Sequence, residues 1–248
     1  MDWVKSFYTK QQEWANVYSG DIMEDHRKRV NTVKKLCGSS PQQILELGAG
    51  GGQFAVAAAE FGYNVTAVEL ISSGVQQIKK LSKRPKKGTL NIIEGDFYNI
   101  KLNNRFDVVC YWDGFGIGSD EEQKYLLERI SKWLKPNGSA LIDIYTPWYW
   151  SKVVGVEMEF INIKRHYSFD FEECRMLDRW CPKEDENQAV TQSLRCYSPA
   201  DLDLLLQDTG LRIESIEPGG AMNYETMKYI EKVPLEQAMS YLVKLVIN

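Results

Sequence analysis

The 248-residue sequence is poor in the residues that build disulfide frameworks and metal sites. Its five cysteines, at positions 37, 110, 174, 181 and 196, are odd in number, and no two of them have C-x-x-C spacing. Histidine occurs only twice. These shortages argue against a disulfide scaffold and a zinc site, and we expect no bound metal. The thiols are expected to be reduced, with Cys110 in FDVVCYW a small core residue.

Long apolar runs are also missing, and no stretch approaches the roughly 20 residues that a membrane-spanning helix needs. The first residues, MDWVKSFYTKQQEW, lack the basic start and apolar run of a signal peptide. The net charge of −4 indicates no general attraction to nucleic acid or anionic lipid. We therefore expect a cytoplasmic protein that makes no use of a membrane.

What the sequence does contain is a regular alternation of strand-like and helix-like segments. Apolar or β-branched segments typical of buried strands are QILEL, NVTAVEL, TLNIIEGD, FDVVCYWDG and SALIDIY. Helix-like segments between them are GQFAVAAAEFG, a stretch from about residue 72 to 81, and EEQKYLLERISKWL, which LKPNG ends. Strands separated by single helices predict right-handed crossovers and an α/β fold with a doubly wound parallel sheet.

The segments on either side of this core have different patterns. Residues from about Trp3 to Leu36 are helix-like, and their charged part MEDHRKRV, which includes His26, is expected to be a solvated face. After Pro147, the segments EMEFINIKRHYSFDF, CRMLDRW and AVTQSLRCY predict an antiparallel β insertion, and DLDLLLQDTG, LRIESIEP and SYLVKLVIN complete the sheet. We expect one domain over residues 1–248: a helical cap (1–38), a cofactor-binding core (39–147), a substrate-side insertion (148–196) and a final helix and strands (197–248).

A glycine-rich turn follows the first predicted strand in ELGAGGGQF. The dinucleotide fingerprint is G-x-G-x-x-G, whose third glycine eases close packing of helix and strand. Here Gly48, Gly50 and Gly52 give G-x-G-x-G, and Gln53 stands in place of the third dinucleotide glycine. The turn therefore argues against NAD, although such turns often serve packing alone.

Two carboxylates at later strand ends make a ligand site more credible. Glu69 ends the second predicted strand, about 20 residues after the first glycine, where an acid can accept hydrogen bonds from both hydroxyls of a ribose. Asp96 ends the third strand, placed to accept a hydrogen bond from an adenine amino group, and Phe97 could pack against the ring. Each acid alone could be a solvated strand end, but the ordered set favours a nucleoside ligand.

The segments ELGAGGG, VEL, EGDF and LKPNGSALIDIY together resemble the class I S-adenosylmethionine (SAM)-dependent methyltransferase family over residues 40–147. The segment RCYSPADLDLLLQDTGLRIESIEP resembles that family's last helix and strand. The resemblance implies a seven-stranded sheet with its final strand antiparallel, and SAM as the cofactor. The same resemblance implies which residues bind the cofactor: Gly48, Ala49 and Gly50 contact its methionine part, Glu69 and Leu70 its ribose, and Asp96 and Phe97 its adenine. It also implies that Glu46 supports the turn.

SAM is a cation without phosphates, so carboxylates and aromatic faces suit it. Methyl transfer needs orientation, exclusion of water and, for some acceptors, removal of a proton. By resemblance, Trp112 and Asp113 in YWDGFGIGSD lie near the amino acid end of the cofactor, and Phe115 faces the reaction centre. Tyr8 and Trp14 are expected to cover the cofactor and Trp148 in TPWYW to line the substrate site, although aromatic residues are as often part of the core.

The insertion contains one candidate base. His166 lies in KRHYSFDF, and a near-neutral imidazole is a plausible proton acceptor. Its neighbour Arg165 could bind an acidic substrate. A lone histidine on a strand is more often structural, so the hypothesis needs a test: a catalytic His166 requires that His166→Ala reduce turnover far more than SAM affinity.

The pattern favours a methyltransferase acting on oxygen, nitrogen or carbon of a small-molecule acceptor, and three alternatives stay open. The basic run KKLSKRPKK (79–87) could serve tRNA or a protein substrate, but the N-P-P-Y/F signature of many base and glutamine N-methyltransferases is replaced by YWDG. An NAD-dependent oxidoreductase is opposed by Gln53. The third alternative is a protein that binds SAM but does not catalyse methyl transfer. The sequence indicates neither the acceptor nor the oligomeric state.

Overall fold

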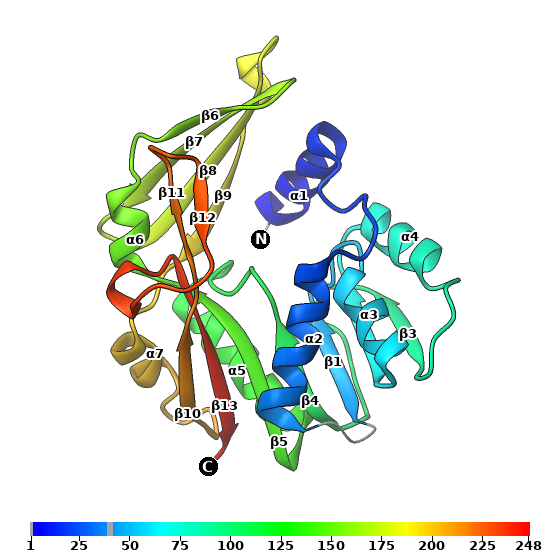
Figure 1. Ribbon diagram of the computed structural model, residues 1–248. Helices are drawn as coiled ribbons and strands as arrows, with labels where there is room; N and C mark the ends of the chain where they lie inside the picture. Colours follow the sequence, from blue (N-terminus) through cyan, green and yellow to red (C-terminus); the bar gives the residue numbers. More distant parts are fainter. Residues whose placement is uncertain (1, 39–41) are drawn as a thin grey trace.

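The computed structural model describes residues 2–38 and 42–248, and its centre is a seven-stranded sheet in the order β10-β13-β5-β4-β1-β2-β3 (Figure 1). The parallel strands are β1 (Gln43–Leu47), β2 (Asn64–Glu69), β3 (Leu90–Glu94), β4 (Phe106–Tyr111) and β5 (Leu134–Tyr145). The last strand, β13 (Ser240–Ile247), runs antiparallel to both of its neighbours, β5 and β10 (Leu211–Pro218). The predicted α/β fold, with seven strands and an antiparallel last strand, is confirmed.

Apolar clusters lie on both faces of this sheet. On one face α2 (Glu24–Cys37), α3 (Gln53–Phe61) and α4 (Ser72–Leu81) contribute Val30, the alanines of α3 and Ile78. On the other face α5 (Asp120–Trp133) and α7 (Pro199–Leu205) contribute Leu126, Leu127 and Leu202. Alanine at most inward positions lets α3 pack close to the sheet, which brings its N-terminal glycine turn against the strand ends.

Helix α5 ends at Trp133, and β5 begins at the next residue, so the expected turn at LKPNG is not a separate element. Leu134 directly follows α5 and pairs with Phe106, and the register then shifts before Val108 pairs with Ser139. The segment LKPNG is thus an irregular first part of β5 rather than a separate turn. Its proline and glycine end the helix as expected, because proline cannot continue it, but the chain is already at the sheet.

The insertion forms a second, four-stranded antiparallel sheet beside the first (Figure 1). Its strands are β6 (Glu157–Glu159), β7 (Ile163–Asp170), β8 (Arg175–Pro182) and β9 (Val190–Arg195), reached from β5 through α6 (Pro147–Lys152). The remaining short elements are η1 (Glu186–Gln188), the hairpin β11 (Ala221–Asn223) with β12 (Lys228–Ile230), and η2 (Leu235–Gln237).

The two N-terminal helices attach to different parts of the molecule. Helix α2 packs on α3 of the core, whereas α1 (Asp2–Ala15) lies against β9 of the insertion. The edge of the Phe7 ring meets Trp180 of the insertion, with ring centres 6.2 Å apart. The linker between α1 and α2 therefore crosses from the insertion to the sheet, above the glycine turn. In the described ranges, no helix is long and apolar enough to cross a membrane.

Candidate functional site

A cavity of about 1430 Å³ lies at the carboxyl ends of the parallel strands, where open α/β sheets bind their ligands. Three parts of the chain form its walls: the core, α1 with the linker that follows it, and the insertion. The lining includes Gly48, Ala49, Gly50, Glu69, Leu70, Asp96, Phe97, Trp112 and Asp113 from the core, Tyr8, Gln11, Trp14 and Tyr18 from the N-terminal segment, and Phe160, Ile161, Ile163, Arg165, Trp180 and Gln192 from the insertion.

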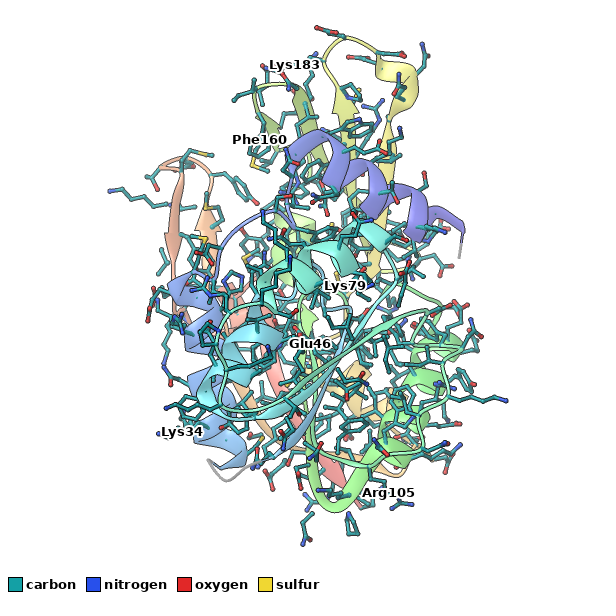
Figure 2. The ribbon with its side chains drawn as sticks, turned by 90° about the vertical axis from the view of Figure 1, so that its right-hand side faces the viewer. Lys34, Glu46, Lys79, Arg105, Phe160 and Lys183 are labelled. Atoms are coloured by element: carbon teal, nitrogen blue, oxygen red, sulfur yellow. The ribbon has the colours of Figure 1, made fainter. Side chains whose placement is uncertain are left out.

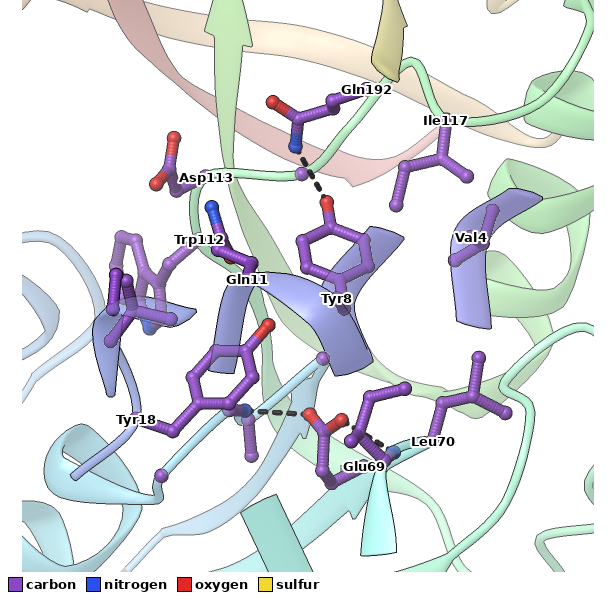
Figure 3. A pocket seen from close by; sticks show the side chains of 18 of the residues that line it. Val4, Tyr8, Gln11, Tyr18, Glu69, Leu70, Trp112, Asp113, Ile117 and Gln192 are labelled. Atoms are coloured by element: carbon purple, nitrogen blue, oxygen red, sulfur yellow. Dashed lines mark hydrogen bonds between the residues drawn. The ribbon is translucent and has the colours of Figure 1, made fainter. Parts of the chain in front are cut away.

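The glycine turn closes the floor of the cavity with main-chain atoms. Gly50 has a left-handed φ of +55°, and its N–H donates to Oε2 of Glu69 at 2.6 Å (Figure 3). A side chain at Gly51 would place its Cβ 2.2 Å from the carbonyl oxygen of Tyr18, so the linker lies directly on the turn. The side-chain amide of Gln53 donates to the same carbonyl at 3.1 Å. The residue that replaces the third dinucleotide glycine thus fastens the linker over the turn.

Two buried carboxylates lie under the cavity, and neither forms an ion pair with a described residue. Glu69 also accepts a hydrogen bond from the Ile71 N–H at 2.8 Å, yet burial raises the pKa of its carboxyl from 4.5 to about 7. Burial raises the pKa of Glu46 to about 8, against a smaller opposing effect of Arg29. Oε2 of Glu46 has no hydrogen-bond partner among the described residues. Glu46 is buried, and Figure 2 shows it near the middle of the view, with Phe160 in the insertion above it.

A polar corner of the cavity lies between α2, β4 and β5. The guanidinium of Arg29 lies over the Trp112 ring, 5.3 Å from its centre, and 4.0 Å from the Asp143 carboxylate. The buried Nε1 of Trp112 has no partner in the described part of the chain. His26 and Arg29 both line the cavity, so the expectation that MEDHRKRV is only a solvated face is wrong. A charged helix face carries no periodic signal that shows which side meets a cavity.

The end of the cavity near β3 carries an acid and an aromatic ring. Asp96 accepts hydrogen bonds from the Tyr98 N–H at 2.8 Å and from the Asn99 side chain at 2.8 Å. The Phe97 ring packs edge-on against Tyr111, with centres 5.3 Å apart. These contacts fix both side chains beside the strand ends.

The opposite end, under the insertion, holds a second polar group. Arg165 donates to both oxygens of the buried Asp178, at 2.7 and 2.6 Å, and its guanidinium lies 4.7 Å from the Tyr167 ring centre and 5.1 Å from that of Trp180. The hydroxyl oxygen of Tyr8 accepts a hydrogen bond from the Gln192 amide at 2.8 Å (Figure 3). Both side chains are thus held in one orientation toward the cavity.

Three of the sequence-predicted site residues do not line the cavity. Phe115 is 1% exposed and packs between Tyr111 and Tyr197 in the core. Trp148 donates from Nε1 to the Leu235 carbonyl of η2 at 2.8 Å. His166 is paired across β6 and β8 with Glu157 and Arg179, and its Nδ1 lies 3.5 Å from the Glu157 carboxylate. The eleven predicted cofactor residues and Arg165 all line the cavity.

The fold is of the α/β methyltransferase type, with a single antiparallel strand, β13, between β5 and β10. Solved structures agree. The CcbJ methyltransferase from Streptomyces caelestis is similar with a TM-score of 0.74 and 18% identity over 96% of each chain. A SAM-dependent methyltransferase from Clostridium acetobutylicum is similar with a TM-score of 0.69 and 15% identity over 98% of each chain.

Sequence comparison leads to the same family. Residues 44–138 match a family model described as a methyltransferase domain. A ubiquinone biosynthesis O-methyltransferase of Rickettsia canadensis is 24% identical over 79% of this chain and 71% of that protein. A cypemycin N-terminal methyltransferase of a Streptomyces species is 34% identical over 42% of each. Residues 44–138 thus form a methyltransferase domain, and SAM is its methyl donor.

Proposed function

We propose that the protein transfers the methyl group of SAM to an oxygen, nitrogen or carbon atom of a small-molecule acceptor. The observation that carries this proposal is one cavity with two unlike halves. One half is formed by the glycine turn, Glu69 and Asp96, and the other by α1 and the insertion. A donor in the first half meets an acceptor in the second.

The described residues fit SAM. We assign Gly48, Ala49, Gly50 and Trp112 to its methionine part, Glu69 and Leu70 to the ribose, Asp96 and Phe97 to the adenine, and Tyr8 and Trp14 to the cover. Among the described residues, Oε2 of Glu46 and Nε1 of Trp112 have no hydrogen-bond partner, and Arg29 lies beside them over the Trp112 ring. We assign these groups to the amino acid end of the cofactor, which carries both charges. When bound, SAM supplies an activated methyl group on a cationic sulfur. The chain's own part is then to orient the acceptor and exclude water.

The walls of the acceptor half favour a small molecule. The cavity is roofed by α1 and the insertion, which restricts the size of the acceptor that reaches the donor. The basic run 79–87, the basis of the tRNA and protein alternatives, is partly neutralised, because Arg84 pairs with both Asp21 and Glu60. The relatives are named for an oxygen acceptor and for an N-terminus, so their names leave the acceptor atom of this protein open.

We further propose that the chain acts as a single domain, with residues 1–38 as cap, 39–147 as cofactor core, 148–196 as substrate-side insertion and 197–248 as the end of the sheet. A cytoplasmic location is consistent with its five free cysteines, which a reducing compartment would maintain.

The proposal is tested in two steps. Calorimetric titration with SAM, S-adenosylhomocysteine (SAH) and NAD should show binding of the first two only. Incubation with [methyl-³H]SAM should then label a component of a small-metabolite extract and not purified tRNA. Binding of NAD without SAM contradicts the cofactor assignment, and labelling of tRNA alone contradicts the acceptor class.

A further inference from the structure

The loop after β4 presents a carboxylate to the cavity in an unusual backbone conformation. Asp113 has a φ of +55°, a left-handed value that few residues other than glycine adopt. The loop is anchored directly after this residue: the Tyr111 hydroxyl donates to the Gly114 carbonyl at 2.7 Å, and Arg175 of the insertion donates to the carbonyls of Gly116 and Gly118 at 3.0 and 3.2 Å. The surrounding contacts thus fix Asp113 where it projects into the cavity.

One oxygen of this carboxylate is oriented and the other is free for a ligand. The Tyr145 hydroxyl donates to Oδ1 of Asp113. Tyr145 itself is held by Trp150, with the rings stacked and their centres 5.0 Å apart. Among the described residues, none bonds to Oδ2 of Asp113 and none forms an ion pair with the carboxylate.

The cations nearby are already engaged with other acids. Arg165 is held by both oxygens of Asp178, and Arg29 lies next to Asp143. Asp113 therefore presents a carboxylate without a cationic partner among the described residues, next to Tyr145 and in the wall of the cavity that Tyr8 and Arg165 also line. A ligand that brings a positive charge and an N–H donor complements this position.

From this geometry we infer that the acceptor is an amine, which Asp113 binds as its ammonium form and from which Asp113 takes the proton before methyl transfer. This inference rests on the proposed methyltransferase function. It moves Asp113 from the cofactor side, where the family resemblance put it, to the acceptor, and it gives the role of base to Asp113 instead of His166. Tyr145 is then a positioning residue.

The step balances as follows. An N–H proton of the ammonium moves to Oδ2 of Asp113 and leaves a lone pair on nitrogen. That lone pair forms the new bond to the methyl carbon, while the bond from carbon to sulfur breaks and its electron pair stays on sulfur. The products are a methylammonium ion, neutral SAH and a protonated Asp113, which returns its proton to water.

Binding of charge-matched probes tests the recognition part. Benzylamine, benzyl alcohol and benzoate share one ring and differ in charge, and each is titrated against protein saturated with SAH. We expect benzylammonium to bind at least about tenfold more tightly than benzyl alcohol, as a charge-assisted hydrogen bond predicts. Asp113→Asn, which keeps the shape and tolerates a left-handed φ, should remove this preference. Asp203→Asn, on the exposed face of α7, is the matched control and should keep it.

Transfer from [methyl-³H]SAM to benzylamine and phenethylamine tests the proton step, with benzyl and phenethyl alcohol as counterparts. Label should appear in the amines, and Asp113→Asn should lower kcat by roughly 100-fold or more, with Tyr145→Phe intermediate. Label in the alcohols alone, label in none of the four, or equal binding of the three charge probes overturns the inference. So does an Asp113→Asn variant that loses affinity for SAH itself, because Asp113 then serves the cofactor. Wild-type protein that fails to bind SAH contradicts the proposed function instead.

Discussion

Single residues of the cavity connect cofactor binding to pH. Ligand-free Glu69 has a pKa raised by burial to about 7, so a large fraction of it is protonated at neutral pH. A protonated carboxylic acid accepts hydrogen bonds from ribose hydroxyl groups less well than a carboxylate does. If the ribose of the cofactor binds to the ionised form of Glu69, binding must lower the pKa of Glu69 and release a proton.

We therefore expect the affinity for SAH to rise as the pH increases from about 6 to about 8, with proton release on binding. Calorimetry in buffers of different ionisation enthalpy measures both. Glu69→Gln should weaken binding by roughly 10- to 100-fold, the value of a charge-assisted hydrogen bond, and flatten the pH dependence near 7. Glu236→Gln, at an exposed site, is the control. A pH profile that Glu69→Gln leaves unchanged would assign the effect to another group, with Glu46 the first candidate.

Arg29 is one of the cavity residues that the sequence interpretation missed, and it allows a selective test. If its guanidinium binds the carboxylate of the cofactor's amino acid end, Arg29→Met should weaken SAH binding by roughly tenfold or more. Binding of 5′-deoxy-5′-methylthioadenosine, which lacks that end, should stay within about twofold of wild type. Equal weakening of both ligands would mean that Arg29 supports the site only through its packing on Trp112.

At the scale of elements, the alternation of β7 separates two adjacent residues. Successive side chains of a strand point to opposite faces, and Arg165 faces the cavity while His166 does not. His166→Ala should accordingly leave both SAH affinity and methyl transfer within about twofold of wild type. Turnover assays on the labelled acceptor decide this, with Arg179→Ala, its cross-strand neighbour, as control. A large loss of turnover with intact SAH binding would restore His166 as the base.

The same comparison shows which elements a sequence can predict. Buried strands such as β1 and β4, with burial at almost every position, leave a strong apolar signal, and the glycine and carboxylates at their ends follow from the position of each strand. The hairpin of β11 and β12 was missed because its short strands are mostly exposed and carry no alternating pattern. Phe115 and Trp148 were misplaced because an aromatic residue type does not show whether its ring faces a ligand or the core.

At the scale of the whole molecule, the cavity joins segments that are far apart in the sequence. Glu69 comes from the sheet, Tyr8 from α1 and Arg165 from the insertion, and α1 packs mainly against β9 of the insertion. A ligand that contacts the glycine turn, α1 and the insertion at once stabilises only the arrangement in which all three surround it. Its binding should therefore stabilise all three parts together.

We expect saturating SAH, at about 100 times its dissociation constant, to stabilise the folded state by roughly 2.7 kcal/mol and to raise the melting temperature accordingly. NAD at the same concentration should have no such effect. Amide hydrogen exchange then locates the stabilisation: protection should increase in α1 and in β7 and β8 as well as at the ends of β1 and β2. If protection were confined to the strand ends, α1 and the insertion would not contact the cofactor, and Tyr8 and Trp14 would belong to the acceptor half alone.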